Sequence, residues 1–120
     1  MTDYLDKLER DFGYMLKHTS GYVCPGWEQL IRDMLGDVHD YVKVDNEFYD
    51  ISDTTPVFTD IKEKFGTLRV YGYNLDDEIQ AILDRYAALS ADTCMTCGKA
   101  GTMRTKNGWL MVRCEAHLPT

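Results

Sequence analysis

Four residues near the C-terminus, in the pattern C-x2-C-x16-C-x2-H, constrain the fold more than any other feature of this chain. They are Cys94, Cys97, Cys114 and His117. Two close pairs of ligands separated by a hairpin-length stretch can converge on one tetrahedral zinc ion. The stretch between them predicts such a hairpin, because Asn107-Gly108 is a turn pair flanked by two strand-like runs. Residues 94–117 therefore predict a zinc ribbon.

The composition of this ligand set predicts what the metal does. Three thiolates and one imidazole fill a tetrahedron and leave no open position for water or substrate. Closed sites of this kind are structural, whereas catalytic zinc keeps a vacancy. The motif therefore predicts one structural Zn²⁺ and argues against a zinc hydrolase.

The rest of the chain predicts an α+β body. With 120 residues, of which 44% are hydrophobic, the chain fits one domain plus a small appended module. Apolar periodicity predicts two N-terminal helices, over residues 3–17 and about 27–42, and a third helix from about 74–76 to 90. Runs at 57–62 and 67–73 predict a β-hairpin with its loop at 63–66. We expect a body over residues 1–93 and a ribbon module over 94–120 that packs on it, because no flexible linker separates them.

The second predicted helix has the clearest two-faced pattern. Its apolar stripe predicts these core residues: Trp27, Leu30, Ile31, Met34, Leu35 and Val38. Asp33, Asp37 and Asp40 follow the opposite face, where substitution should change stability little. This acidic face is a candidate binding surface, and solubility is its plainer interpretation.

Charge is distributed unevenly along the chain. The net charge is −7, yet four cations against Glu115 give residues 94–120 a charge of +3, so residues 1–93 carry −10. An acidic body repels a phosphate backbone, which limits nucleic-acid contact to the ribbon or to a local patch.

The predicted hairpin of the body carries that kind of patch. Its basic and aromatic residues are Lys62, Lys64, Arg69 and Tyr71, together with Tyr73. Rings beside cations can stack bases and neutralise phosphates, and they can also dock a protein. Alternatively, the tyrosines pack under the third helix and the cations are solvated.

Two further residues were weighed as reactive groups. His39 stands beside Asp40, but adjacent helical residues point about 100° apart, so we expect exposed helix surface rather than an acid–base pair. Cys24 has no histidine near it in sequence and is expected to be a small buried apolar group.

Several strings, taken together, resemble a group of small uncharacterised phage and prophage proteins in which a K-E-K-F-G-x-L-R-x-Y hairpin precedes a zinc ribbon. The matching strings are Gly26-Trp27, the run I-K-E-K-F-G-T-L-R-V-Y over 61–71, Cys94-Met95-Thr96-Cys97-Gly98, Trp109, and Cys114-Glu115-Ala116-His117. The resemblance covers roughly residues 26–117 and implies a phage product acting in a bacterial host. It supplies no catalytic residues.

These observations lead to one expected function and two alternatives. We expect a non-enzymatic protein that binds a host or phage protein, as an inhibitor of host machinery that could include defence systems. The first alternative binds nucleic acid or nucleotides through Lys62, Lys64, Arg69 and the ribbon cations Arg104, Lys106 and Arg113. The second is an enzyme that uses carboxylates of residues 33–60 with another metal. The N-terminal residues lack the apolar centre of a secretory signal and no run reaches ~18 apolar residues, so we expect a cytoplasmic protein with no membrane contact.

Overall fold

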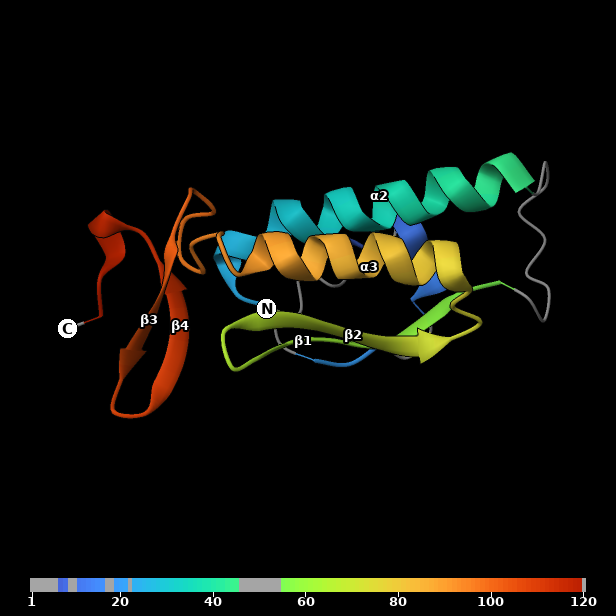
Figure 1. The fold of residues 1–120 in the computed structure, drawn as a ribbon. Coiled ribbons are helices and arrows are strands. Elements are labelled where there is room, and N and C mark those ends of the chain that lie inside the picture. The colour runs from blue at the N-terminus through green and yellow to red at the C-terminus, as the bar shows by residue number, and fades with distance from the viewer. Residues whose placement is uncertain (1–6, 9–10, 17–18, 22, 46–54, 120) are drawn as a thin grey trace.

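The computed structural model describes residues 7–8, 11–16, 19–21, 23–45 and 55–119 (Figure 1). Two α-helices, α2 (Glu28–Asp45) and α3 (Asp77–Ser90), lie along one side of a hairpin formed by β1 (Val57–Lys64) and β2 (Thr67–Tyr73). A second antiparallel hairpin, β3 (Thr102–Lys106) and β4 (Trp109–Arg113), stands at one end of the body. Three short 3-10 turns complete the described elements: η1 (Gly13–Met15), η2 (Pro25–Trp27) and η3 (Glu115–His117).

The mixed α+β class was predicted correctly. Two α-helices are described over their whole length, where the sequence predicted three. Of the predicted helix at 3–17, residues 7–8 and 11–12 are α-helical, and residues 3–6, 9–10 and 17 lie outside the described part of the chain. Its described end is the 3-10 turn η1, in which the Leu16 N–H donates to the Gly13 carbonyl at 3.2 Å. The predicted connection at 44–56 likewise falls largely outside the described part of the chain.

Helix α2 buries the predicted apolar stripe. Trp27, Ile31, Met34, Leu35 and Val38 are fully buried, whereas Leu30 is only half-buried against the core. Burying side chains of this size stabilises a fold by roughly 1.5–3 kcal/mol each, so this stripe holds α2 onto the body. Among the described residues, no helix combines the length and the apolar content needed to cross a bilayer.

The hairpin β1–β2 has a two-residue turn, shorter than the predicted loop. Phe65 and Gly66 occupy it with φ of 55° and 81°, and positive φ at both central residues is typical of a type I′ turn. The register pairs Lys64 with Thr67 and Lys62 with Arg69. Because side chains alternate along a strand, one face carries these residues and the other face turns Ile61 and Leu68 into the core.

Helix α3 begins at a capped end. The side chain of Asp76 accepts a hydrogen bond from the Ile79 N–H at 2.9 Å, which satisfies a donor that the first turn leaves unpaired. Ile79, Leu83 and Tyr86 face the core. Leu89, near the end of the helix, is exposed.

The ribbon segment is joined to the body by contacts of η2. The Gly26 N–H donates to the Met95 carbonyl at 2.8 Å, and the Trp27 indole N–H donates to the Thr93 carbonyl at 3.0 Å. A Cβ atom on Gly26 would lie 1.9 Å from the Cys94 carbonyl oxygen. Only glycine therefore permits this approach, which brings the first metal-ligand candidate against the body.

Candidate metal centre and exposed surfaces

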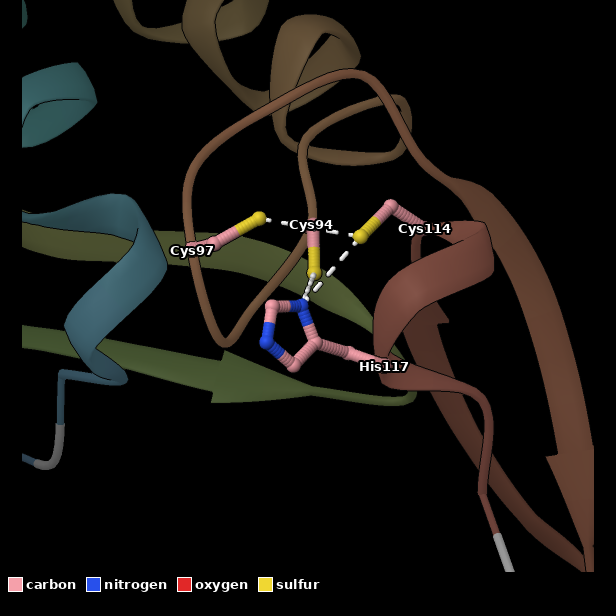
Figure 2. Close-up of side chains that lie close together, drawn as sticks. All are labelled: Cys94, Cys97, Cys114 and His117. Carbon is pink, nitrogen blue, oxygen red and sulfur yellow. Dashed lines mark hydrogen bonds between the residues drawn. The ribbon is translucent and has the colours of Figure 1, made fainter.

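The four residues of the C-terminal motif converge on one point (Figure 2). The three sulfur atoms and the Nδ1 atom of His117 all lie within 4.8 Å of one another. The Cys97 and Cys114 sulfurs are 3.7 Å apart, and His117 Nδ1 lies 3.2 Å from the Cys114 sulfur and 3.9 Å from that of Cys94. A disulfide needs about 2.05 Å, so these are free thiols that can hold one metal ion.

Two tight backbone turns position the ligands. In the first, the Gly98 N–H donates to the Cys94 carbonyl, and the Cys94 N–H donates to the Lys99 carbonyl. Gly98 has φ of 82°, as expected for the tight loop predicted after Cys97. In the second, Cys114 precedes η3 and its carbonyl accepts the His117 N–H at 3.0 Å. Hairpin β3–β4 carries the second pair of ligands back to the first.

The environment of Cys94 favours the form that binds metals. Burial by itself raises the pKa of this thiol, but hydrogen bonds from the backbone N–H groups of Cys97, Thr96 and Cys114 lower it to about 6. A thiolate, rather than a thiol, is the metal ligand. Cys24 is the opposite case, because burial raises the pKa of its thiol to about 12. It is a buried neutral group, as predicted.

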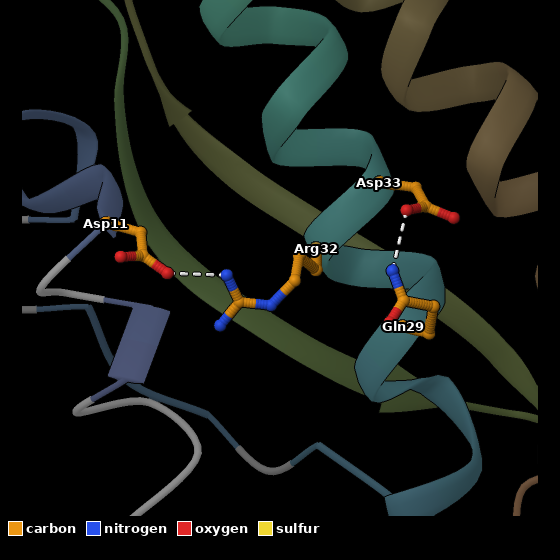
Figure 3. A network of polar contacts seen from close by, with 4 residues as sticks. All are labelled: Asp11, Gln29, Arg32 and Asp33. Carbon is orange, nitrogen blue, oxygen red and sulfur yellow. Dashed lines mark hydrogen bonds and ion pairs between the residues drawn. The ribbon is translucent and has the colours of Figure 1, made fainter.

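Of the predicted acidic face, Asp33 and Asp40 are exposed. The Asp33 carboxylate accepts a hydrogen bond from the Gln29 side chain one turn earlier on α2, at 2.8 Å (Figure 3). On another side of α2, Arg32 forms an ion pair of 2.6 Å with Asp11 from the N-terminal segment. Exposed pairs of this kind contribute little stability.

Asp37 corrects the prediction of a uniform acidic face. Its Oδ2 atom accepts hydrogen bonds from the Tyr86 hydroxyl and from Arg85 Nη2, both on α3. The carboxylate therefore joins the two helices instead of standing free, and its substitution should cost stability. The prediction that placed Asp37 on a face without contacts missed this junction, because helical periodicity does not reveal which neighbour packs beside a polar stripe.

His39 is also not the bare helix surface that the sequence predicted. Its Nδ1 atom lies 2.7 Å from the Tyr14 hydroxyl, and its ring lies against Phe12 and Tyr14 with ring centroids 6.0 and 5.7 Å away. These aromatic rings come from the segment around η1. His39 therefore connects α2 to the N-terminal segment.

The basic and aromatic residues of the first hairpin share its outer face, as predicted. Lys62 Nζ lies 5.5 Å from the centre of the Tyr71 ring, and Arg69 lies directly across the ladder from Lys62. Tyr71 and Arg69 are exposed, so the alternative that the tyrosine packs under α3 is wrong. Lys64 is separate from this group, because it lies at the turn with its Nζ 5.6 Å from the centre of the Phe65 ring.

One surface was not predicted from the sequence. The turns of the two hairpins lie beside each other and enclose a cleft of about 390 Å³, called the tip cleft here. Its lining residues are Glu63, Lys64, Phe65, Asn107, Gly108, Trp109 and Leu110. Phe65 is 64% exposed and Trp109 is 75% exposed. The available signal was Phe65-Gly66 in a turn that favours Asn-Gly, because a bulky residue with positive φ is uncommon.

Comparison with protein-family models, with curated proteins and with solved structures gives no match to this chain. The resemblance to phage proteins and the function it implies therefore stay predictions, and the functional argument rests on the site and the surfaces.

Proposed function

We propose that this chain is a non-enzymatic, protein-binding protein whose C-terminal ribbon is held together by one structural zinc ion. The sulfur separation of 3.7 Å between Cys97 and Cys114 supports zinc. A tetrahedron with Zn–S bonds of about 2.3 Å has edges of roughly 3.8 Å. Three sulfurs and one ring nitrogen complete four-coordination, so the metal would have no open position for a ligand. It would stabilise the ribbon, and a partner would bind to the surface of the protein instead.

The observation that carries the binding proposal is the identity of Phe65. Both hairpins use two-residue turns with positive φ, and the second has Asn107-Gly108, the pair that suits this geometry. The first has a phenylalanine at the equivalent place, with its ring largely in solvent. A bulky residue with positive φ lowers the stability of the fold by roughly 1 kcal/mol or more. Backbone strain of this kind is concentrated at functional sites. Phe65 and Trp109 line one cleft, and large aromatic residues are typical anchors of protein interfaces.

The experiment compares capture of partners from a bacterial host lysate by tagged protein and its variants. Phe65→Asn with Trp109→Thr removes both rings with residues that suit a type I′ turn and a strand, and Leu89→Ala is the control for an exposed apolar residue elsewhere. We expect the partner to be lost only with the double variant. Asp33→Lys with Asp40→Lys tests the acidic face without touching Asp37. Loss of the captured partner in the Asp33→Lys, Asp40→Lys variant alone would show that the binding surface lies on α2.

Nucleic-acid binding is the second candidate, and one observation favours it. The register of the second hairpin pairs Arg104 with Met111, Lys106 with Trp109 and Thr102 with Arg113. Since opposed residues share a face, three cations and the exposed tryptophan lie on one side of the ribbon. Retention of single-stranded DNA that weakens steeply with salt, and is lost in Lys106→Ala with Trp109→Thr, would favour this candidate. The acidic body argues against it.

The resemblance stated above gives the proposal a biological setting. It supports a partner in the bacterial cytoplasm, where a phage product would inhibit host machinery. Mass spectrometry of the captured protein tests this part of the proposal separately from the surface that binds it.

A further inference from the structure

Among the described residues, strand β2 forms an unpaired edge of the body's sheet. On the other side of the hairpin, the segment around Ser20 runs along β1: the Ser20 N–H donates to the Thr59 carbonyl at 2.9 Å, and the Ile61 N–H donates to the Ser20 carbonyl at 3.0 Å. This segment extends the sheet beyond β1. No described strand or bridge pairs with the outer side of β2.

The backbone of β2 directs hydrogen-bonding groups toward that open side. Lys64 and Thr67 close a two-residue turn, so alternate residues from Leu68 onward point their N–H and C=O groups away from β1. The hydrogen bond from the Leu68 N–H to Ser90 Oγ, at 2.9 Å, agrees with this direction. Val70 comes next in the alternation, and neither of its backbone groups has a partner among the described residues. An unpaired edge of this kind is a template for another strand.

A groove lies beside this edge, under α3. Its volume is about 350 Å³, and its lining residues are Thr67, Leu68, Arg69, Val70, Tyr71, Gln80, Leu83, Asp84 and Ala87. Five consecutive β2 residues form one wall, and a single stripe of α3 forms the other. Helix α3 runs alongside β2 (Figure 1). The groove between them lies beside the open edge and could receive one more strand.

We propose that the β2 edge binds an extended peptide segment of a protein partner as an added strand. This rests on the proposed protein-binding function and specifies the segment bound. Side chains opposite Val70 would face the apolar wall of Leu68 and Leu83, so they should be small and apolar. The residue opposite Arg69 should be acidic, because Arg69 is exposed and Lys62 stands directly across the ladder from it. Asp60, on the same face of the hairpin, already accepts a hydrogen bond from the Ser20 hydroxyl.

Amide hydrogen exchange of the zinc-loaded protein tests the open edge before any partner is added. The amide of Val70 should exchange much faster than those of Arg69 and Tyr71, whose N–H groups point toward β1 in the same ladder. Equal protection of all three amides would show that the edge is already covered, by the chain itself or by a second copy. That result would overturn the proposal.

A titration with the capped peptide Thr-Val-Glu-Val-Thr tests the added strand, with amide chemical shifts of the labelled protein as the readout. Its valines would lie opposite Leu68 and Val70 and donate their N–H groups to the carbonyls of these residues, and its glutamate would lie opposite Arg69. The Leu68 N–H is already bonded to Ser90 Oγ, so only the carbonyl of Leu68 is open to the peptide. N-methylation of both valines should weaken binding by about tenfold or more, because it removes the hydrogen bonds to the edge. N-methylation of the glutamate is the matched control, since its N–H would point away from β2.

Charge reversal supplies a test that does not depend on the peptide backbone. Arg69→Glu should weaken binding of the glutamate peptide and favour the same peptide with lysine at the centre. Equal binding of both N-methylated peptides, or shifts at Val70 produced by oligo-dT instead of peptide, would overturn the proposal. The Phe65→Asn, Trp109→Thr variant should bind the peptide normally. If the peptide does not bind, and the Phe65→Asn, Trp109→Thr variant loses the captured partner, the protein-binding function is supported but the β2 edge is not its binding site.

Discussion

The two hairpins have the same backbone turn but different supports. Phe65-Gly66 and Asn107-Gly108 show nearly the same positive φ values, 55° and 81° against 52° and 81°. The first hairpin turns Ile61 and Leu68 into a core covered by two helices. In the second hairpin, Val112 is the one fully buried side chain among the residues of β3 and β4, all of which are described. The metal-ligand candidates lie at the end of this hairpin opposite its turn.

This difference shows what a small antiparallel hairpin needs for stability. An isolated hairpin is marginal in water, so each one has to be completed by another structural element. Packing against helices completes β1–β2, and coordination of a metal would complete β3–β4. The two should therefore fail under different conditions, although they belong to one short chain.

Metal removal should give the largest effect. Zinc in small modules supplies about 10 kcal/mol or more of apparent binding free energy, so a chelator or Cys97→Ser should unfold residues 94–117 and leave the body folded. Thiol labelling would measure this. We expect no rapid labelling of the loaded protein, then three reactive cysteines after chelation, with Cys24 unreactive because burial raises the pKa of its thiol to about 12. Amide spectra showing a folded ribbon in the absence of metal would contradict the proposal that the second hairpin depends on the metal.

Core truncation should affect the first hairpin selectively. Ile61 is fully buried on β1, and Ile61→Ala should lower the free energy of unfolding of the body by about 2–5 kcal/mol. Ile82→Ala makes the same chemical change at a half-buried position of α3, and should cost clearly less. Denaturant unfolding gives both values. Zinc affinity should be unchanged in both variants, and a parallel loss of zinc would show that the two hairpins fold as one unit.

The junction between the two regions should give an intermediate effect. A Cβ atom at Gly26 would meet the Cys94 carbonyl at 1.9 Å, so Gly26→Ala should push the ribbon away from η2 at a cost of about 1–3 kcal/mol. Gly36 provides the matched control, because a Cβ there meets nothing within 4 Å. Gly36→Ala should stabilise α2 by roughly 0.5–1 kcal/mol. Thermal unfolding followed at both regions distinguishes a lost junction from general destabilisation.

The sequence predicted the features that depend on local spacing. Paired metal-ligand candidates with two residues between them, alternating strand residues and the stripe of α2 all follow from short-range periodicity. It missed the features that depend on which elements become neighbours. Asp37 was misplaced because periodicity does not show that α3 lies beside it. The tip cleft was missed because the proximity of Phe65 and Trp109 depends on how the ribbon docks at Gly26.

Exchange of the two turn residues should give the smallest effect and the most direct comparison of the hairpins. Phe65→Asn places Asn-Gly in a turn with positive φ at both positions, so it should stabilise the body by about 0.5–1 kcal/mol. Asn107→Phe makes the reverse change in the second turn and should destabilise the ribbon by a similar amount. Denaturant unfolding of the zinc-loaded variants measures both.

The outcome of that exchange bears on function as well as on stability. If Phe65→Asn stabilises the protein and weakens partner capture, the native chain gives up turn stability to keep an exposed ring at the tip cleft. If Phe65→Asn is destabilising instead, the ring contributes packing that exceeds its backbone strain. Phe65 would then be a structural residue, and the case for binding at the tip cleft would rest on Trp109 alone.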